Sequence, residues 1–255
     1  MHSDWQPSKW QEFEDLAWGK LEVGDHTGAR HAALKAIALE PDAIDCYVIL
    51  AQLAHVVGQK QAYAREAVRL GEVEFEQEIA AAPSDEFPFW GITRTRPYMR
   101  GLHTLALSLW EDSRKGAKEE AIEIALHMLR ICPNDNIGMR FLLPEWLARQ
   151  GRWSIGQEVL ADCGDNVRTE MSMWAALYAF KDGNLDKAAE LVASARKANP
   201  YMVGQLLLKR HPKRTNEQWV AAGSIEEAKA HAVQAYDLWR SLEGGEKWLS
   251  QFPQR

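Results

Sequence analysis

The stretch GDHTGARHAALKAIALEP (residues 24–41) has a skeleton that the chain repeats as GNLDKAAELVASARKANP (residues 183–200). Both stretches begin with Gly and end with Pro, and both place Ala five and twelve residues after the Gly. That spacing puts the two alanines on the same side of an α-helix. A Gly–helix–Pro segment that occurs twice in one chain indicates a repeated structural unit.

Four glycines, Gly24, Gly58, Gly151 and Gly183, anchor copies of this pattern. The positions five, nine and twelve residues after each anchor share one property, which is that they hold small or apolar residues. They are Ala29, Ala33, Ala36, Tyr63, Ala67, Leu70, Gly156, Leu160, Cys163, Ala188, Val192 and Ala195. Offsets of four and then three residues place each set on one helical stripe, so we expect a helix after each Gly.

A second stripe precedes each anchor, at eleven, eight, seven and four residues before the Gly. Its positions are mostly apolar, with Lys20, Arg140 and Ser172 as the exceptions. They are Phe13, Leu16, Ala17, Lys20, Tyr47, Leu50, Ala51, Ala54, Arg140, Leu143, Pro144, Leu147, Ser172, Ala175, Ala176 and Ala179. Each unit is therefore predicted to be a helix, a Gly turn and a second helix.

A fifth unit has a longer turn. The second-helix stripe is Ala121, Ala125 and Met128, and Pro133 follows it. The first-helix stripe of the same unit is Leu102, Leu105, Ala106 and Leu109. That stripe predicts a turn at Ser113, so the loop that ends at Gly116 is three residues longer than in the other units.

Physical chemistry explains why these residues recur. Gly adopts a positive φ in the turn without the steric penalty of a Cβ atom. Pro stops the second helix because it lacks an amide hydrogen and clashes with the preceding turn. Small residues on the facing stripes let paired helices approach closely, and stacking buries the faces that one pair leaves exposed.

The pattern resembles the tetratricopeptide repeat, a helix pair of 34 residues. Gly24 and Gly58 are 34 residues apart, and Gly151 and Gly183 are 32 residues apart. Five units are predicted, at residues 10–43, 44–77, 99–136, 137–168 and 169–202. The stretches CPNDNIGMRFLLPEWLARQGRW, KANPYMVGQLLLKR and GSIEEAKAHAVQAYDLWRSLEGGEKWL resemble the suppression-of-tumorigenicity-seven (ST7-like) family and its bacterial repeat-protein relatives. That resemblance implies the fold and transfers no catalytic residue.

We therefore predict an all-α chain, a tetratricopeptide-like α-solenoid forming one domain over residues 1–255. Two repeats occupy residues 10–77 and three occupy residues 99–202. Between them, residues 78–98 contain three prolines and clustered aromatics, which predicts an ordered insertion loop. Residues 203–255 are expected to cap the array, with a helix at 225–242 that starts from the capping-box pair Ser224 and Glu227.

Composition limits the class of partner. The formal net charge is −6, and the three cysteines form no CxxC pair. The beginning of the chain does not match a secretory signal, and no run approaches the roughly 20 apolar residues of a membrane helix. We expect a soluble, cytoplasmic protein whose partners are neither nucleic acids nor membranes.

Catalytic motifs are missing from the sequence. No two of the eight histidines have the four-residue spacing of an HExxH metal site, and the chain has no GxSxG, GxxxxGK[ST] or GxGxxG motif. The basic run KRHPKR (residues 209–214) has acidic surroundings and no aromatic platform, so a solvated loop is favoured over a nucleic-acid contact. We predict a non-enzymatic protein with no cofactor and no metal.

The repeat frame predicts a binding surface on the first helices, which line the concave side of such arrays. Its exposed positions are the second, fifth, ninth and twelfth of each unit. Those positions include Trp18, His55, Arg100, His103, Trp110, Phe141, Glu145, Met173 and Phe180. This mixture of aromatic and charged side chains is typical of a groove that binds a peptide or a partner protein. The other interpretation is that the insertion or the cap fills the groove from within.

The leading hypothesis is an interaction scaffold or accessory subunit, and the chain is compatible with a homo-oligomer or a hetero-complex. The alternative is a small-ligand sensor or an enzyme with a pocket near residues 94–103, formed by Arg96, Tyr98, Arg100 and His103. Arg94, Arg96 and Arg100 either clamp a partner's carboxylate or pair with acidic residues nearby, Asp85 and Glu86.

Overall fold

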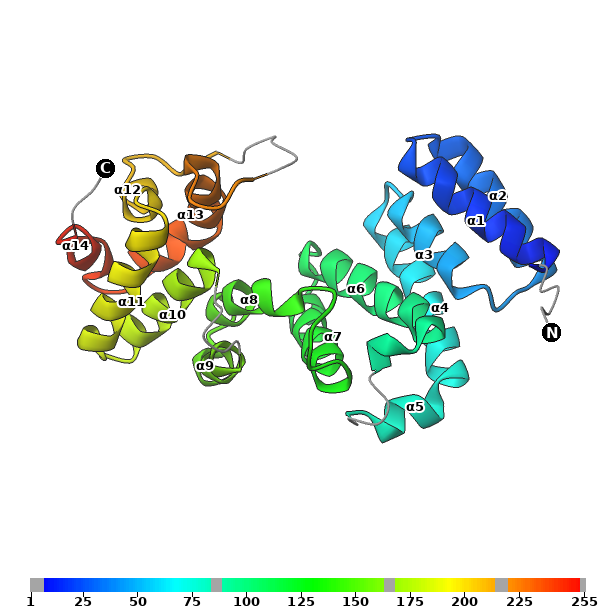
Figure 1. Ribbon diagram of the computed structural model, residues 1–255, viewed down its shortest axis with the longest axis horizontal. Helices are drawn as coiled ribbons and strands as arrows, with labels where there is room; N and C mark the ends of the chain where they lie inside the picture. The colour runs from blue at the N-terminus through cyan, green and yellow to red at the C-terminus, as the bar shows by residue number, and fades with distance from the viewer. Residues whose placement is uncertain (1–6, 84–88, 163–167, 214–219, 253–255) are drawn as a thin grey trace, which may run out of the picture. The chain divides into compact units, whose positions relative to one another are not determined.

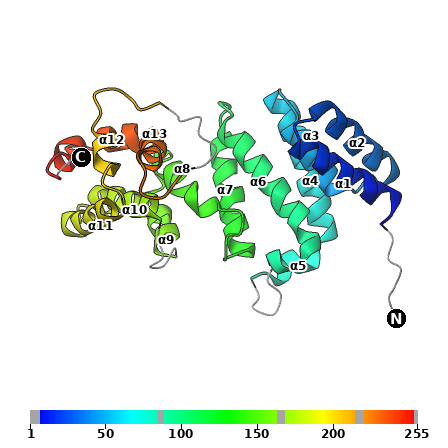
Figure 2. The ribbon, with the colours of Figure 1, turned by 45° about the horizontal axis from the view of Figure 1, so that its top comes forward.

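A computed structural model describes residues 7–83, 89–162, 168–213 and 220–252. Within these ranges the regular structure consists of helices, and no strand is present. The chain contacts group into two compact units, unit 1 (Met1–Met139) and unit 2 (Arg140–Arg255), and we describe each unit by itself. The predicted fold class, an all-α array of helix pairs, is confirmed for the described residues (Figures 1 and 2).

Unit 1 contains three antiparallel helix pairs, and short connecting helices lie between the second pair and the third. The pairs are α1 (Lys9–Glu22) with α2 (His26–Leu39), α3 (Ile44–Gln52) with α4 (Val57–Glu74), and α6 (Arg96–Trp110) with α7 (Ala117–Ile131). The connecting elements are α5 (Glu76–Ala81) and the 3₁₀ helices η1 (Phe89–Gly91) and η2 (Thr93–Thr95). The first helices α1, α3 and α6 form a row in which α3 contacts both of the others.

Unit 2 contains two helix pairs and a C-terminal group of helices. The pairs are α8 (Leu143–Arg149) with α9 (Trp153–Ala161), and α10 (Thr169–Lys181) with α11 (Leu185–Ala198). The C-terminal group is α12 (Met202–Leu206), α13 (Ile225–Ser241) and α14 (Gly245–Leu249), and the 3₁₀ helix η3 (Met139–Phe141) lies at the boundary between the units.

The two Gly–Pro stretches fold as the sequence predicts. Gly24 and Gly183 adopt left-handed φ values of 78° and 79°. The next residue in each turn caps the second helix, since Asp25 accepts a hydrogen bond from the Gly28 amide at 2.8 Å and Asn184 accepts one from the Lys187 amide at 3.2 Å. The stripe Ala29, Ala33 and Ala36 is fully buried between helices.

The prediction for Gly58 was wrong. Gly58 lies inside the first turn of α4, has no left-handed φ, and the turn between α3 and α4 is formed by residues 53–56. The residue before α4, Val56, takes an extended conformation and starts the helix without a glycine. Leu16 also differs from its prediction, because it is 47 % exposed on α1.

The first helix of the fourth pair is shorter than the stripe from Arg140 predicts. Pro144 is the second residue of α8. Because Pro has no amide hydrogen, it is tolerated in the first turn and favours a helix start there. Arg140 therefore belongs to η3, outside the helix. Cys163, predicted for the second stripe, lies outside the described residues.

The insertion is ordered where the structure describes it, but part of it is helical. Helix α5 extends from Glu76 to Ala81 and so includes the first residues of the predicted insertion. Phe89 is 3 % exposed, and its ring centroid lies 6.1 Å from that of Tyr98. Trp90 and Ile92 are half-buried. Phe87, Asp85 and Glu86 lie outside the described residues.

The C-terminal helix and its cap are confirmed. Ser224 accepts a hydrogen bond from the Glu227 amide at 3.1 Å, whereas the Glu227 carboxylate accepts from the Gly223 amide at 2.7 Å. Ala228, Ala232, Ala235 and Trp239 are fully buried in the core of unit 2. Helix α13 therefore covers the apolar side of α10 and α12.

None of the described helices combines the length and the apolar character that crossing a membrane requires.

Candidate functional site

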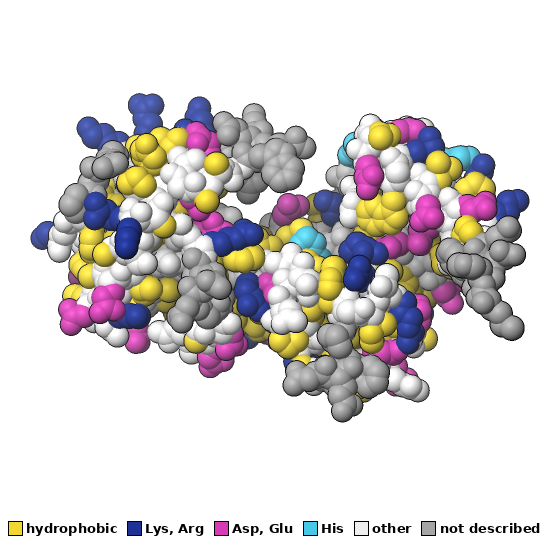
Figure 3. Space-filling view, in the orientation of Figure 1, with side chains coloured by type: hydrophobic (Ala, Val, Ile, Leu, Met, Phe, Trp, Pro, Cys, Tyr) yellow, Lys and Arg dark blue, Asp and Glu magenta, His cyan; other side chains and the backbone are white. Residues whose placement is uncertain are grey.

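The row of helices α1, α3 and α6 carries a cluster of buried and partly exposed polar and aromatic side chains, which we call the first-helix face. Its centre consists of Glu14 and Trp18 from α1, Asp45 and Cys46 from α3, and Arg100 from α6. On the face that Figure 3 shows, hydrophobic, basic and acidic side chains are mixed over unit 1. The row of first helices therefore brings together residues that are far apart in the sequence.

A charge-assisted pair fixes α3 to α6. Arg100 donates from Nε to Oδ1 of Asp45 at 2.8 Å, and its Nη2 donates to Oδ2 of the same carboxylate. The Asp45 side chain is 6 % exposed and the Arg100 side chain 34 % exposed. The guanidinium also lies over the indole ring of Trp18, 5.6 Å from the ring centroid. Bidentate geometry of this kind gives strong and directional hydrogen bonds.

A second carboxylate, Glu14, lies beside this pair. Its hydrogen-bond donor within the described chain is the Cys46 thiol, with Sγ 3.8 Å from Oε2. Burial raises the pKa of Glu14 to about 7, and the neighbouring charges of Asp45 and Asp15 add to the increase. Burial and the adjacent Glu14 also raise the pKa of the Cys46 thiol, so the thiol keeps its proton and donates. Near pH 7 a charged group that comes close to Glu14 therefore changes the fraction of Glu14 that is ionised.

The structure places the unit 1 residues of the predicted surface as follows. Trp18 and Arg100 meet, as described above, and Trp18 is partly exposed. His55 is exposed, but it lies in the turn after α3 and not on the helix. His103 is half-buried on α6, where burial lowers its pKa. Trp110 ends α6, partly exposed, with Nζ of Lys118 5.2 Å from its ring centroid.

In unit 2 the predicted residues are more strongly engaged within the chain. The Arg168 guanidinium lies 4.2 Å from the ring centroid of Phe141. Glu145 accepts from Nε of Arg149 at 2.8 Å. The Phe180 ring packs 5.6 Å from Trp239 and 5.0 Å from Trp248.

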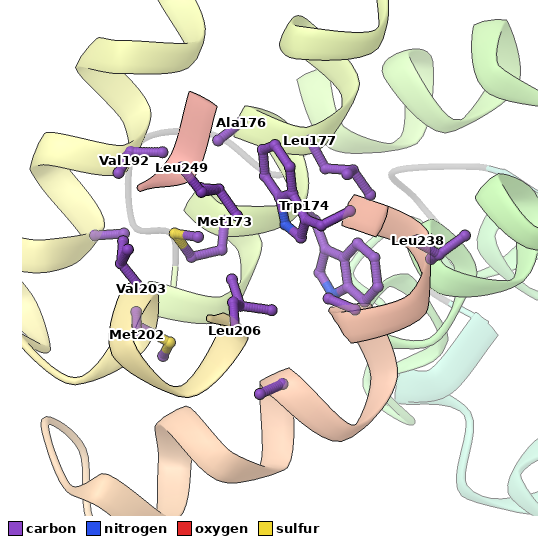
Figure 4. Close-up of a cluster of buried hydrophobic side chains, with 14 of the residues drawn as sticks. Met173, Trp174, Ala176, Leu177, Val192, Met202, Val203, Leu206, Leu238 and Leu249 are labelled. Carbon is purple, nitrogen blue, oxygen red and sulfur yellow. The ribbon is translucent and has the colours of Figure 1, made fainter. Parts of the chain in front are cut away.

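Met173 cannot belong to an open binding surface, and its placement there was wrong. Its side chain is fully buried. Figure 4 shows it among Val203, Leu206 and Leu249, which come from α12 and α14. The C-terminal helices cover this position of α10.

The pocket proposed for residues 94–103 is not assembled by its four residues. Arg96 lies over the ring of Trp90 at 5.3 Å. Tyr98 is 1 % exposed, and its hydroxyl is 3.2 Å from Nε2 of His127. Arg100 turns instead to Asp45. The helix directs these side chains to different sides of α6.

A groove of about 710 Å³ lies between α4 and α7, with Leu102 and Leu105 of α6 in its floor. Its arginines on α4 are already paired. Arg65 donates to both carboxylate oxygens of Glu120 at 2.6 and 2.8 Å, and Arg69 pairs with Glu66. The charges of Arg65 and Arg69 are therefore already balanced by carboxylates of the chain.

Arg94 and His211, from the two remaining basic segments, make contacts within the chain, whereas Lys209, Arg210 and Lys213 are exposed. Arg94 pairs with Glu78 and lies over the Phe75 ring at 5.4 Å. In the basic run, His211 approaches Asp237 with Nε2 3.5 Å from Oδ2 and packs on Tyr236. Across the described ranges, no group of three or more His, Cys, Asp or Glu side chains has a metal-binding arrangement.

Sequence reasoning missed Glu14 and Asp45. Both occupy positions of the frame that predicted the surface, since Glu14 is fifth in the unit that starts at Trp10 and Asp45 is second in the unit that starts at Ile44. The predicted surface included one carboxylate of the frame, Glu145, but neither of these two. Asp45 is distinguished only by its burial and its ion pair with Arg100 on α6, which the sequence does not show.

Comparisons with known proteins identify no family. No protein-family model matches the chain, and no curated protein matches it. Among solved structures, a thermophilic TPR protein of Thermus thermophilus is similar over 74 % of this chain and 90 % of that protein, with 16 % identity and a TM-score of 0.40. Two structures are only loosely alike at that level, so the architecture given above rests on the helices and contacts of this chain.

Proposed function

We propose that the protein is a non-enzymatic interaction module that binds a segment of a partner protein on the first-helix face of unit 1. One observation carries the proposal. The partly exposed Trp18 contacts Arg100 of a buried ion pair that fixes α3 to α6, and a second carboxylate, Glu14, lies four residues before Trp18 on the same helix. A rigid aromatic group next to oriented charges is typical of the centre of a protein interface.

The repeat architecture supports this role. The three first helices are neighbours in a row, and Arg100 is held by contacts to Asp45 and Trp18 on the other two helices. Because these contacts exist before a partner arrives, binding does not have to order the side chains, which lowers its entropic cost. Such a surface suits an extended or helical segment of another protein.

Affinity capture with matched variants tests the proposal. The wild-type protein is compared with a Trp18→Ala/Trp110→Ala variant and with Val73→Ser, which removes a 72 % exposed apolar side chain from α4, away from the first helices. We expect a partner that the wild type and Val73→Ser retain and that the double variant loses. Thermal melting shows that each variant is folded.

Amide hydrogen exchange locates the contact. Binding of the captured partner should slow exchange in α1, α3 and α6 more than in α2, α4 and α7. Equal capture by all three proteins, or protection confined to the second helices, would contradict the assignment to the first-helix face.

A further inference from the structure

Resting on the proposed function, we propose that the partner segment presents a lysine side chain, whose ammonium binds between Glu14 and Trp18 on the first-helix face. The inference concerns the chemical class of the contact, a primary ammonium. It follows from the charges, the hydrogen-bond donors and the aromatic surface that the three helices bring together.

The first step is the local charge balance. Two carboxylates, Glu14 and Asp45, lie beside one guanidinium, Arg100. Asp45 uses both donor groups that Arg100 directs to this site, Nε and Nη2. Within the described chain, Glu14 receives only the Cys46 thiol, a weak donor at 3.8 Å. Partly buried carboxylates in proteins are normally paired with a cation, so the face is complementary to one more positive charge.

The second step is the aromatic wall. Trp18 lies four residues after Glu14 on α1, so both side chains project from the same side of the helix. The indole already has one cation, Arg100, 5.6 Å from its centroid and remains partly exposed. Indole rings attract ammonium groups, and desolvation strengthens that attraction. A lysine stem would also cover the apolar edge of the ring.

The third step separates an ammonium from a guanidinium. An arginine binds a carboxylate best through two oxygens, as Arg100 does with Asp45. On Glu14, Oε2 already accepts from Cys46. A compact ammonium is a point donor that needs one oxygen, and it therefore matches Glu14 better.

The ionisation of Glu14 links this contact to pH. The groups that act on its carboxylate are Asp15 on α1, Asp45 and Cys46 on α3, and Arg100 on α6. With its pKa raised to about 7, Glu14 is only partly ionised in neutral solution. A bound ammonium favours the ionised form, so binding releases a proton and becomes tighter as pH rises from about 6 to about 8.

The experiment uses a minimal probe, N-α-acetyl-lysine amide, which keeps a free ε-ammonium. It is titrated into the full chain, and the indole N–H resonance of Trp18, assigned with Trp18→Phe, is followed by NMR. We expect a saturable shift with a dissociation constant on the order of 1 mM. The norleucine amide, which has the stem without the charge, and the glutamate amide should produce no saturable shift.

Variants connect the shift to Glu14. Glu14→Gln should weaken lysine amide binding by about tenfold, the factor expected for one charge-assisted hydrogen bond. Glu14→Lys supplies the ammonium within the chain and should abolish the shift. The control Asp15→Asn removes a neighbouring exposed carboxylate from the same helix and should leave most of the binding in place.

Two results would overturn the inference. One is an equal shift with norleucine amide, and the other is full lysine binding by Glu14→Gln. The proposed function is judged separately, because a partner whose capture depends on Trp18 and is unaffected by Glu14→Gln would keep the interaction module and reject the lysine.

Discussion

At the scale of single residues, burial distinguishes the ion pair of Asp45 with Arg100 from that of Glu120 with Arg65. The Asp45 side chain is 6 % exposed, whereas the Arg65 and Glu120 side chains are 49 % and 40 % exposed. A buried charge that loses its partner keeps its desolvation cost, whereas an exposed charge is solvated again by water. Two chemically similar arginine–carboxylate pairs should therefore differ in their effect on stability.

Substituting each arginine tests this difference. Arg100→Met should lower the free energy of unfolding by about 2 kcal/mol, because Asp45 stays buried and unpaired. Arg65→Met should cost less than about 0.5 kcal/mol. Urea unfolding followed by circular dichroism measures both, and Arg100→Met/Asp45→Asn should recover part of the loss. Equal costs for the two single variants would show that burial of Asp45 is not the cause.

A buried histidine in unit 2 gives stability a dependence on pH. His231 is 3 % exposed, neither ring nitrogen has a hydrogen-bond partner among the described residues, and its ring lies edge-on to Trp174 with the centroids 5.1 Å apart. Burial lowers its pKa from 6.5 to about 3. As pH falls from above 6.5 toward 3, His231 is protonated in the unfolded chain but stays neutral in the folded chain. The contribution of His231 to stability therefore decreases over that range.

We expect this contribution to fall by about 2 kcal/mol between about pH 8 and about pH 5. His231→Phe keeps a ring of similar shape against Trp174 and cannot take up a proton. The wild-type free energy of unfolding should thus decrease more than that of His231→Phe over this range, in parallel urea titrations. Parallel curves for the two proteins would exclude His231 as the origin.

At the scale of helices, Gly156 and Gly58 both lie in second helices of a pair but have different surroundings. Gly156 on α9 approaches Tyr178 of α10 so closely that an added Cβ would overlap the Tyr178 ring and its hydroxyl oxygen. That hydroxyl donates to the Pro144 carbonyl at 2.8 Å, and Tyr178 is 2 % exposed, so the ring has little room to move. Gly58 on α4 has no atom within 4 Å of the same position.

The matched substitutions are Gly156→Ala and Gly58→Ala. Gly156→Ala should destabilise the protein by about 2 kcal/mol, because overpacking outweighs the better helix propensity of Ala. Gly58→Ala should stabilise it by about 0.5 kcal/mol, because the helix gains propensity without a clash. Thermal melting of the two variants shows whether each substitution raises or lowers the stability of the protein. A stabilised Gly156→Ala would mean that α9 and α10 are not in close contact.

At the scale of the whole molecule, charge favours the class of partner that we infer. The chain has 36 acidic and 30 basic residues and a formal net charge of −6. The net negative charge therefore attracts a lysine-bearing partner from a longer distance than the single contact with Glu14 does. Dissolved salt screens that attraction beyond about 10 Å at about 0.1 M ionic strength.

Association should consequently depend on salt. Raising the salt concentration from about 0.05 M to about 0.3 M should slow association with a lysine-bearing partner by several-fold and change dissociation less. Surface plasmon resonance at several salt concentrations separates the two rates. An association rate that does not change with salt would argue against an electrostatic contribution from the whole chain.

The sequence by itself determined the local structure of the repeats. Gly24, Gly183, the alanine stripes and the Ser224 cap predict their turns and helices, because the backbone preferences and spacings that matter lie within a few residues. It did not determine the α3–α4 turn, where Gly58 resembles the other anchors and yet lies in a helix.

Only the tertiary structure decided which surface positions are open and which residues form a site. Met173 and Trp18 were both predicted to face outward, but the C-terminal helices bury Met173 while Trp18 stays partly exposed beside Arg100. Glu14, Asp45 and Arg100 acquire their joint chemistry from helices that are distant in the chain. Burial and long-range pairing depend on how helices stack, and a one-dimensional pattern of residue types does not contain that information.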